Sequence, residues 1–152
     1  MKNIYSKFAI LEPMKNGELK DCAIISFYTP RKSVPDKAIQ VDYSGFCDKV
    51  LYIGVPDIDE KCLADYGYTF DSYISDTRGL AEFIYEAKSN NLNIICQCEF
   101  GTSRSSACAA AILEHFEGRG NEIFSNDEYC PNILVYEKVR RALSEYDKNR
   151  KG

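Results

Sequence analysis

The sequence predicts an α/β domain of three layers, in which a mainly parallel, twisted central sheet is flanked by helices. Short apolar runs typical of strands alternate with helical patterns along the chain. The length of 152 residues is that of about one domain. No internal repeat, low-complexity tract or long linker divides the sequence, so we expect residues 1–152 to form a single domain.

Apolar runs rich in β-branched and aromatic residues indicate the strands. The three strongest runs are residues 23–28, 50–55 and 93–98, and residues 4–11 form a weaker fourth. Each run is nearly continuous rather than alternating, which is typical of strands covered on both faces. In such sheets ligands bind beyond the carboxyl ends of the strands, which directs attention to Pro56-Asp57 and Cys98-Glu99.

Helical spacing of apolar residues indicates the first two helices. In residues 76–88, apolar side chains recur at i, i+3, i+4 and i+7. Residues 104–116 form the second helix, which Gly118 closes. Small residues make up most of its first half, so this helix is expected to lie close to the sheet.

The last helix is expected to begin after Pro131 and Asn132. Proline disfavours a helix before it, and asparagine is a good N-cap. The side chains expected to face inward are apolar: Leu134, Val135, Val139 and Leu143. Those expected to face outward are basic: Lys138, Arg140 and Arg141.

Composition excludes several classes of function. The net charge of −4 provides no broad basic surface for nucleic acid. No apolar run approaches the ~20 residues of a membrane-spanning helix, and residues 1–14 lack the apolar core of a secretory signal. We therefore expect no nucleic-acid partner, no membrane and a cytoplasmic location.

The cysteines and the single histidine restrict the chemistry further. Seven cysteines without a C-x-x-C pair favour free thiols in a reducing compartment over zinc or a disulfide framework. One histidine makes a Ser-His-Asp triad improbable. No metal and no cofactor are expected.

The most informative segment runs from Cys98 to Ser105, between a strong strand and a strong helix. It contains a cysteine, five intervening residues and an arginine, Arg104. A random C-x5-R would occur roughly 0.3 times in this composition, but requiring Gly101 and a hydroxyl residue after the arginine reduces that to roughly 0.002. The segment is therefore a strong signal.

The physics of such a loop favours an anion site. A loop that curls from a strand into a helix N-terminus can direct several backbone N–H groups at one point. Gly101 allows the tight curl, and the Arg104 guanidinium can donate two hydrogen bonds to a phosphoryl group. Helix N-termini and neighbouring cations generally stabilise thiolates, so Cys98 is expected to be an ionised nucleophile. The alternative is a buried structural cysteine, the usual state of a free thiol.

At these residues the sequence resembles the cysteine-based protein tyrosine and dual-specificity phosphatases, in particular their compact bacterial or phage-type branch. The signature of that family is His-Cys-x5-Arg-Ser/Thr, and residues 97–105 match it except that Gln97 replaces the histidine. The pair Pro131-Asn132 resembles the start of the family's last helix. Val55-Pro56-Asp57 resembles its Trp-Pro-Asp loop. The resemblance covers roughly residues 20–145.

The resemblance implies the fold of the dual-specificity type, a Cys98 thiophosphate intermediate and a role for each loop residue. Cys98 is then the nucleophile, Arg104 binds phosphate and stabilises the transition state, and Ser105 assists release of the thiolate. Substrates would be phosphorylated proteins or small phosphomonoesters, with phosphate, sulfate or vanadate as site ligands. The phosphate cradle would be formed by the backbone of Glu99, Phe100, Gly101, Thr102, Ser103 and Arg104.

The general acid implied by the resemblance must follow the second strong strand. Asp57 is favoured because it directly follows Pro56 at the strand end, and Asp59 is the second choice. Such an acid protonates the leaving oxygen and then activates water.

Three alternatives remain open. Gln97 can keep a hydrogen bond but supplies no charge, so one alternative is a pseudophosphatase that binds phosphorylated partners without turnover. Other thiolate enzymes with similar loops are rhodanese-fold phosphatases and arsenate reductases. Cys96 shares a strand face with Cys98, so a protective disulfide between them is the alternative to an ordinary buried thiol.

Overall fold

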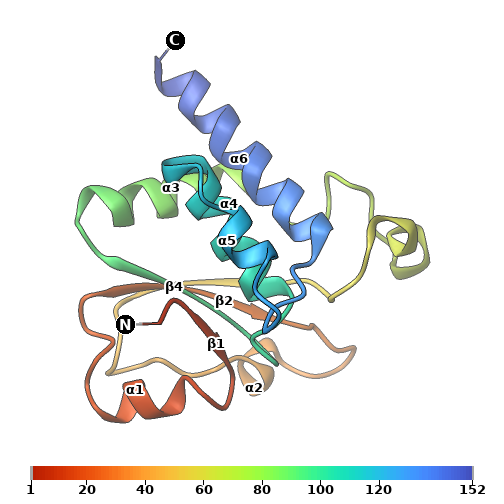
Figure 1. Ribbon diagram of the computed structural model, residues 1–152. Helices are drawn as coiled ribbons and strands as arrows, with labels where there is room; N and C mark the ends of the chain where they lie inside the picture. Colours follow the sequence, from red (N-terminus) through yellow and green to blue (C-terminus); the bar gives the residue numbers. More distant parts are fainter. Residues whose placement is uncertain (1, 152) are drawn as a thin grey trace.

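Four parallel strands form the central sheet of the computed structural model, which describes residues 2–151 (Figure 1). The strand order is β1-β4-β2-β3, so β4 is paired on both sides. The strands are β1 (Ile4–Ser6), β2 (Cys22–Tyr28), β3 (Lys49–Gly54) and β4 (Asn93–Cys98). The three strong strand predictions are confirmed to within one residue at each end.

The first strand is shorter than residues 4–11 predict. The Ser6 hydroxyl accepts a hydrogen bond from Ala9 N at 2.9 Å, and the Ser6 carbonyl accepts one from Ile10 N at 3.1 Å. These bonds turn the chain out of the sheet and into the short helix α1 (Leu11–Lys15).

Helices cover one face of the sheet, and a thinner layer covers the other, so the predicted three layers are confirmed. Figure 1 shows the long helices on one side of the sheet and α1 and α2 (Asp36–Ile39) on the opposite side. The second layer also includes the buried side chains Val41, Tyr43 and Cys47, which pack against Ile24 and Ile95 of the sheet. The long helices are α3 (Thr77–Ser89), α4 (Arg104–Glu117) and α6 (Ile133–Lys151); the short ones are η1 (Glu60–Cys62), η2 (Ala64–Tyr66) and α5 (Asn121–Phe124).

Helix α4 lies close to the sheet, as its small residues predict. The face that packs against the core is made of small side chains that are fully buried: Ala107, Cys108, Ala110 and Ala111. The helix ends at Gly118, which has the left-handed backbone conformation with φ of 68°. The small residues of α4 therefore allow the helix to lie close to the sheet.

Helix α6 confirms most of its sequence-based prediction. The Asn132 side chain accepts a hydrogen bond from Val135 N at 2.9 Å, which is the predicted N-cap, and the four apolar residues predicted to face inward are buried. Arg141 is exposed as predicted, but the prediction for Lys138 is wrong. Lys138 is buried because its ammonium donates to the Phe70 carbonyl at 2.8 Å and lies over the Phe70 ring.

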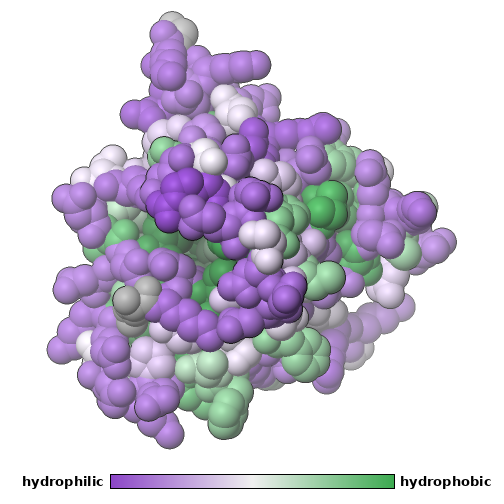
Figure 2. All heavy atoms as spheres, in the orientation of Figure 1, coloured by the Kyte–Doolittle hydropathy of each residue, from purple (hydrophilic) through white to green (hydrophobic). Residues whose placement is uncertain are grey.

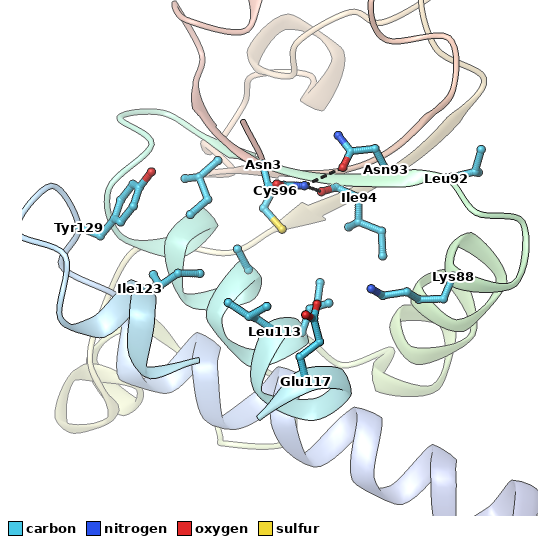
Figure 3. A pocket seen from close by; sticks show the side chains of 13 residues that line it. Asn3, Lys88, Leu92, Asn93, Ile94, Cys96, Leu113, Glu117, Ile123 and Tyr129 are labelled. Atoms are coloured by element: carbon cyan, nitrogen blue, oxygen red, sulfur yellow. Dashed lines mark hydrogen bonds between the residues drawn. The ribbon is translucent and has the colours of Figure 1, made fainter. Parts of the chain in front are cut away.

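A cavity of about 490 Å³ opens between the edge of the sheet and helices α4 and α5. Figure 3 shows Cys96 and Ile94 of β4 on one wall and Leu113 of α4 on the other, with Lys88 and Glu117 at the rim. None of the loop residues 98–104 lines this cavity. Within residues 2–151, no helix has both the length and the apolar character needed to cross a membrane.

We expect Ala111→Leu to lower the free energy of unfolding by about 1–3 kcal/mol, because the larger side chain would overpack the contact between α4 and the core. Denaturant unfolding of the purified protein measures this change. The matched control is Ala109→Leu on the same helix, since Ala109 lines the cavity of Figure 3 and has room for a larger side chain. Equal losses in both variants would contradict this account of the packing.

Candidate functional site

The carboxyl ends of the strands bring the predicted site residues to one edge of the sheet. Cys98 is the last residue of β4, Thr29 follows β2, and Val55 follows β3. Because all strands are parallel, these ends lie on the same side. The sequence places the candidate residues in two separate segments. At this edge, hydrogen bonds connect the segment of Cys98 and Arg104 with the segment of Asp57.

The loop between β4 and α4 is tightly packed against β1. Gly101 has φ of +71°, and a Cβ atom there would lie 2.6 Å from Ser6 N and 2.9 Å from the Tyr5 carbonyl carbon. Lys7 N also donates to the Glu99 carbonyl at 3.1 Å. The sequence has glycine here because both the backbone angle and the close approach exclude a side chain.

The carbonyls of the loop bond to surrounding segments. Besides Glu99, the Thr102 carbonyl accepts from Cys130 N at 2.8 Å, and the Ser103 carbonyl accepts from Asn132 N at 3.1 Å. In a trans peptide unit the N–H of the next residue points the opposite way from the carbonyl. The N–H groups that follow these three carbonyls therefore point away from β1 and residues 130–132, which leaves them available to an anion on the other side of the loop.

Arg104 is buried at the start of α4, with 5% of its surface exposed. Its Nη1 donates to the Val55 carbonyl at 2.6 Å and to the Thr29 hydroxyl at 3.0 Å. Its Nε is buried and has no hydrogen-bond partner among the described residues. One edge of the guanidinium is thus fixed by the ends of β2 and β3, and the Nε donor remains for an anion.

Cys98 lies at the base of the loop and is almost fully buried. Its Sγ is 3.0 Å from the hydroxyl oxygen of Ser105, which is itself buried. A hydroxyl at this distance can donate to a sulfur anion.

The Gln97 side chain is buried, and both polar atoms of its amide are hydrogen-bonded. Its Oε1 accepts hydrogen bonds from Ser26 Oγ at 2.5 Å and from the Tyr43 hydroxyl at 2.7 Å, and its Nε2 donates to the Cys98 carbonyl at 3.0 Å. Burial raises the pKa of Tyr43, which keeps its hydroxyl a neutral donor. The glutamine amide is therefore held in one orientation and supports the backbone of Cys98 without contributing charge.

The carboxylate of Asp57 contacts the loop directly. Its Oδ1 accepts hydrogen bonds from Ser103 Oγ at 2.8 Å and from Asn132 Nδ2 at 2.7 Å, and the same Asn132 nitrogen donates to the Ile58 carbonyl at 2.9 Å. Asp59 instead accepts a hydrogen bond from the Cys62 thiol, which raises the pKa of that thiol. Of the two candidate acids, Asp57 is the one whose hydrogen bonds join it to the loop.

The Cys96 thiol is directed at α4. It hydrogen-bonds to Cys108, and this bond together with burial raises the pKa of Cys96 well above its usual value. Cys96 is thus a neutral buried thiol, the ordinary structural alternative to a disulfide with Cys98.

Two residues of the site were missed by sequence reasoning. Thr29 holds Arg104, and Asn132, which the sequence identified only as a helix cap, also holds Asp57. The signal for Thr29 was present, since it follows a strand end just as Cys98 and Pro56-Asp57 do. The Asn132 contact joins residues 75 positions apart and has no local signal.

Comparison with known proteins shows the fold but no close relative. No family model and no curated protein matches this sequence. Among solved structures, PTPMT1 has a TM-score of 0.57 at 11% identity, covering 98% of this chain and 91% of that one. A mouse putative dual specificity phosphatase, complexed with zinc tungstate, has a TM-score of 0.55 at 13% identity, covering 95% of this chain and 83% of its own.

A third similar structure is the human tyrosine phosphatase-like serine/threonine/tyrosine-interacting protein. Its TM-score is 0.53 at 16% identity, and the match covers 97% of this chain and 87% of that one. The chain therefore has the fold of the cysteine-based protein tyrosine and dual-specificity phosphatases. The fold class expected from the loop signature is confirmed.

We expect Gly101→Ala to lower the free energy of unfolding by about 2–5 kcal/mol, because left-handed strain adds to a collision with the backbone of Ser6. Thermal or denaturant unfolding measures the loss. Gly17→Ala is the matched control: Gly17 has φ of +72° but open space around its Cα, so only the strain of about 1–2 kcal/mol applies. Similar losses at both positions would mean that the close packing of the loop on β1 contributes nothing.

Proposed function

We propose that this protein is a cysteine-dependent phosphomonoester hydrolase, a protein tyrosine or dual-specificity phosphatase. The observation that carries the proposal is the buried guanidinium of Arg104, which Val55 and Thr29 hold at Nη1 while Nε has no partner within residues 2–151, at the end of the loop that begins at the buried Cys98 thiol. A buried cation with an unused donor favours the binding of an anion. A nucleophilic sulfur at the start of the same loop suits attack on a phosphoryl group bound there.

In the first step, Cys98 attacks the phosphorus of a bound ester. The sulfur–phosphorus bond forms as the phosphorus–oxygen bond to the leaving group breaks. Asp57 donates a proton to the leaving oxygen, and Arg104 with the loop N–H groups stabilises the charge on the equatorial oxygens. Ser103 and Asn132 act as positioning residues, because they hold the Asp57 carboxyl beside the loop.

In the second step, the Asp57 carboxylate accepts a proton from water, and the water oxygen attacks phosphorus. The sulfur–phosphorus bond breaks and the electron pair returns to the Cys98 sulfur. The Ser105 hydroxyl, 3.0 Å from that sulfur, donates a hydrogen bond to the departing thiolate. Inorganic phosphate is released, and Cys98 and Asp57 return to the protonation states in which they began the cycle.

A pseudophosphatase is the second candidate, and Gln97 is the observation that favours it. The neutral amide supports the Cys98 backbone but adds no positive charge near the sulfur. Such a protein would bind phosphorylated partners, phosphate or vanadate in the loop without turnover.

We further propose that the substrate is a phosphorylated protein or a small phosphomonoester, met in the cytoplasm. Among the described residues, six cysteines are free thiols, which supports a reducing setting: Cys47, Cys62, Cys96, Cys98, Cys108 and Cys130.

We expect the reduced wild-type protein to hydrolyse p-nitrophenyl phosphate without added cofactor, and Cys98→Ser to abolish that activity. Arg104→Ala should lower kcat/KM by about 10²–10³-fold, because donors aimed at the developing charge are lost. Steady-state assays of the three proteins measure this. Vanadate binding by a wild type that hydrolyses nothing would favour the pseudophosphatase, and neither binding nor turnover would overturn both candidates.

We expect Asp57→Asn to lower kcat for phenyl phosphate by about 10²–10⁴-fold, the usual contribution of a general acid. The loss should be smaller for p-nitrophenyl phosphate, because its leaving group departs without a proton, and the limb of the pH–rate profile assigned to the acid should disappear. Asp59→Asn is the control and should retain the wild-type profile. If Asp59→Asn shows the loss and Asp57→Asn does not, the assignment of the acid is wrong.

A further inference from the structure

A groove of about 780 Å³ lies beside the phosphate-binding loop. Its walls come from three segments: residues 6–14, residues 40–42 and the loop residues Glu99 and Phe100. The groove therefore begins at the two residues that directly follow Cys98. In Figure 2, apolar surface is visible beneath the sheet, in the region where Figure 1 shows α1 and α2.

The groove gathers exposed apolar side chains. Phe8 is 85% exposed, Phe100 is 79% exposed and Leu11 is 39% exposed. Among the described residues, these are three of the six large hydrophobic side chains that are exposed. Their clustering beside a candidate site indicates a surface that is covered when a ligand binds, since removing such surface from water is favourable.

The position of the groove is fixed relative to the loop. Lys7 N donates to the Glu99 carbonyl at 3.1 Å, and Lys7 Nζ donates to the Ile39 carbonyl at 3.3 Å. Gly101 packs against the backbone of Ser6. The wall that carries Phe8 is thus joined both to the loop and to the end of α2, so the groove is preformed.

We propose that this groove binds a large apolar side chain located within a few residues of the phosphorylated residue in a polypeptide substrate. The inference rests on the proposed function, because the phosphate of the same molecule would occupy the loop. The groove is continuous with the loop, because Glu99 and Phe100 belong to both. A chain anchored by its phosphate would therefore extend across Phe100 toward Phe8.

The charges around the groove favour a polypeptide over a lipid surface. Asp42 and Glu99 are the acidic residues that line it, and Lys7 is the basic one. Surfaces that bind anionic membranes carry clusters of lysine and arginine. Here two carboxylates face one ammonium, and that ammonium already donates to the Ile39 carbonyl. The groove is therefore suited to a neutral or basic segment of a polypeptide. Acidic residues beside the phosphorylated residue are thus disfavoured.

The test uses phosphotyrosine peptides in an alanine-glycine background, with one phenylalanine moved through the four positions on each side. We expect kcat/KM to rise about tenfold at positions on one side only, which corresponds to burial of part of a large apolar side chain. Glutamate at the same positions should lower kcat/KM. Equal values for all peptides, with p-nitrophenyl phosphate still hydrolysed, would overturn the groove proposal and leave the proposed function standing.

Phe8→Ser provides the matched variant, since Phe8 lies in an exposed turn outside the catalytic machinery. It should remove the phenylalanine preference and leave hydrolysis of p-nitrophenyl phosphate unchanged. Phe46→Ser is the control, because Phe46 is an exposed phenylalanine that does not line the groove, and it should keep the preference. A preference that survives Phe8→Ser would contradict the proposal.

Dissociation constants for the same peptides separate the groove from catalysis. If the wild-type protein binds phenylalanine-containing phosphopeptides more tightly but hydrolyses nothing, the groove proposal holds and the hydrolase proposal fails. Co-sedimentation with phosphatidylserine vesicles tests whether the groove binds a membrane instead. Vesicle binding that is lost in Phe8→Ser, without any peptide preference, would assign the groove to a membrane and overturn the proposal.

Discussion

The hydrogen bonds of Arg104 Nη1 to the Val55 carbonyl and the Thr29 hydroxyl are the interaction on which the site depends. They join the end of β2 and the end of β3 to the start of α4, which follows β4. Parallel pairing makes this possible, because it places all three strand ends at one edge of the sheet. If α4 began farther from β3, the guanidinium could not be fixed.

The same arrangement connects stability with chemistry. A buried guanidinium is costly unless its donors are paired, and here Nε has no partner in the described part of the chain. Binding of an anion at the loop would compensate that cost, so ligand binding and stability are linked. Polar support extends below the loop, where Ser26 and Tyr43 fix the amide of Gln97. The Gln97 amide and the Arg104 guanidinium are therefore held in defined directions, and preorganised donors of this kind suit electrostatic catalysis.

Local chemistry explains which features could be predicted from the sequence. The loop from Cys98 to Arg104 was predictable because its residues act through neighbours in the chain, and the strands because burial on both faces leaves continuous apolar runs. Long-range contacts were not predictable. The Asn132 amide binds Asp57 and not Asp59, and the Lys138 ammonium is buried because it donates to the Phe70 carbonyl, although the helical pattern places Lys138 on the outer face. The short helices α1, α2 and α5 have too few turns to show a period.

The central claim is that the sulfur of Cys98 carries the phosphoryl group during turnover. Rapid acid quenching of Asp57→Asn protein with phosphorus-labelled p-nitrophenyl phosphate, whose leaving group departs without a proton, followed by peptide mapping, tests it most directly. Loss of the proton acceptor for the second step should let the intermediate accumulate, with label on the peptide that contains Cys98 and none in the Cys98→Ser protein. Label on another residue, or turnover that persists in Cys98→Ser, would contradict the account.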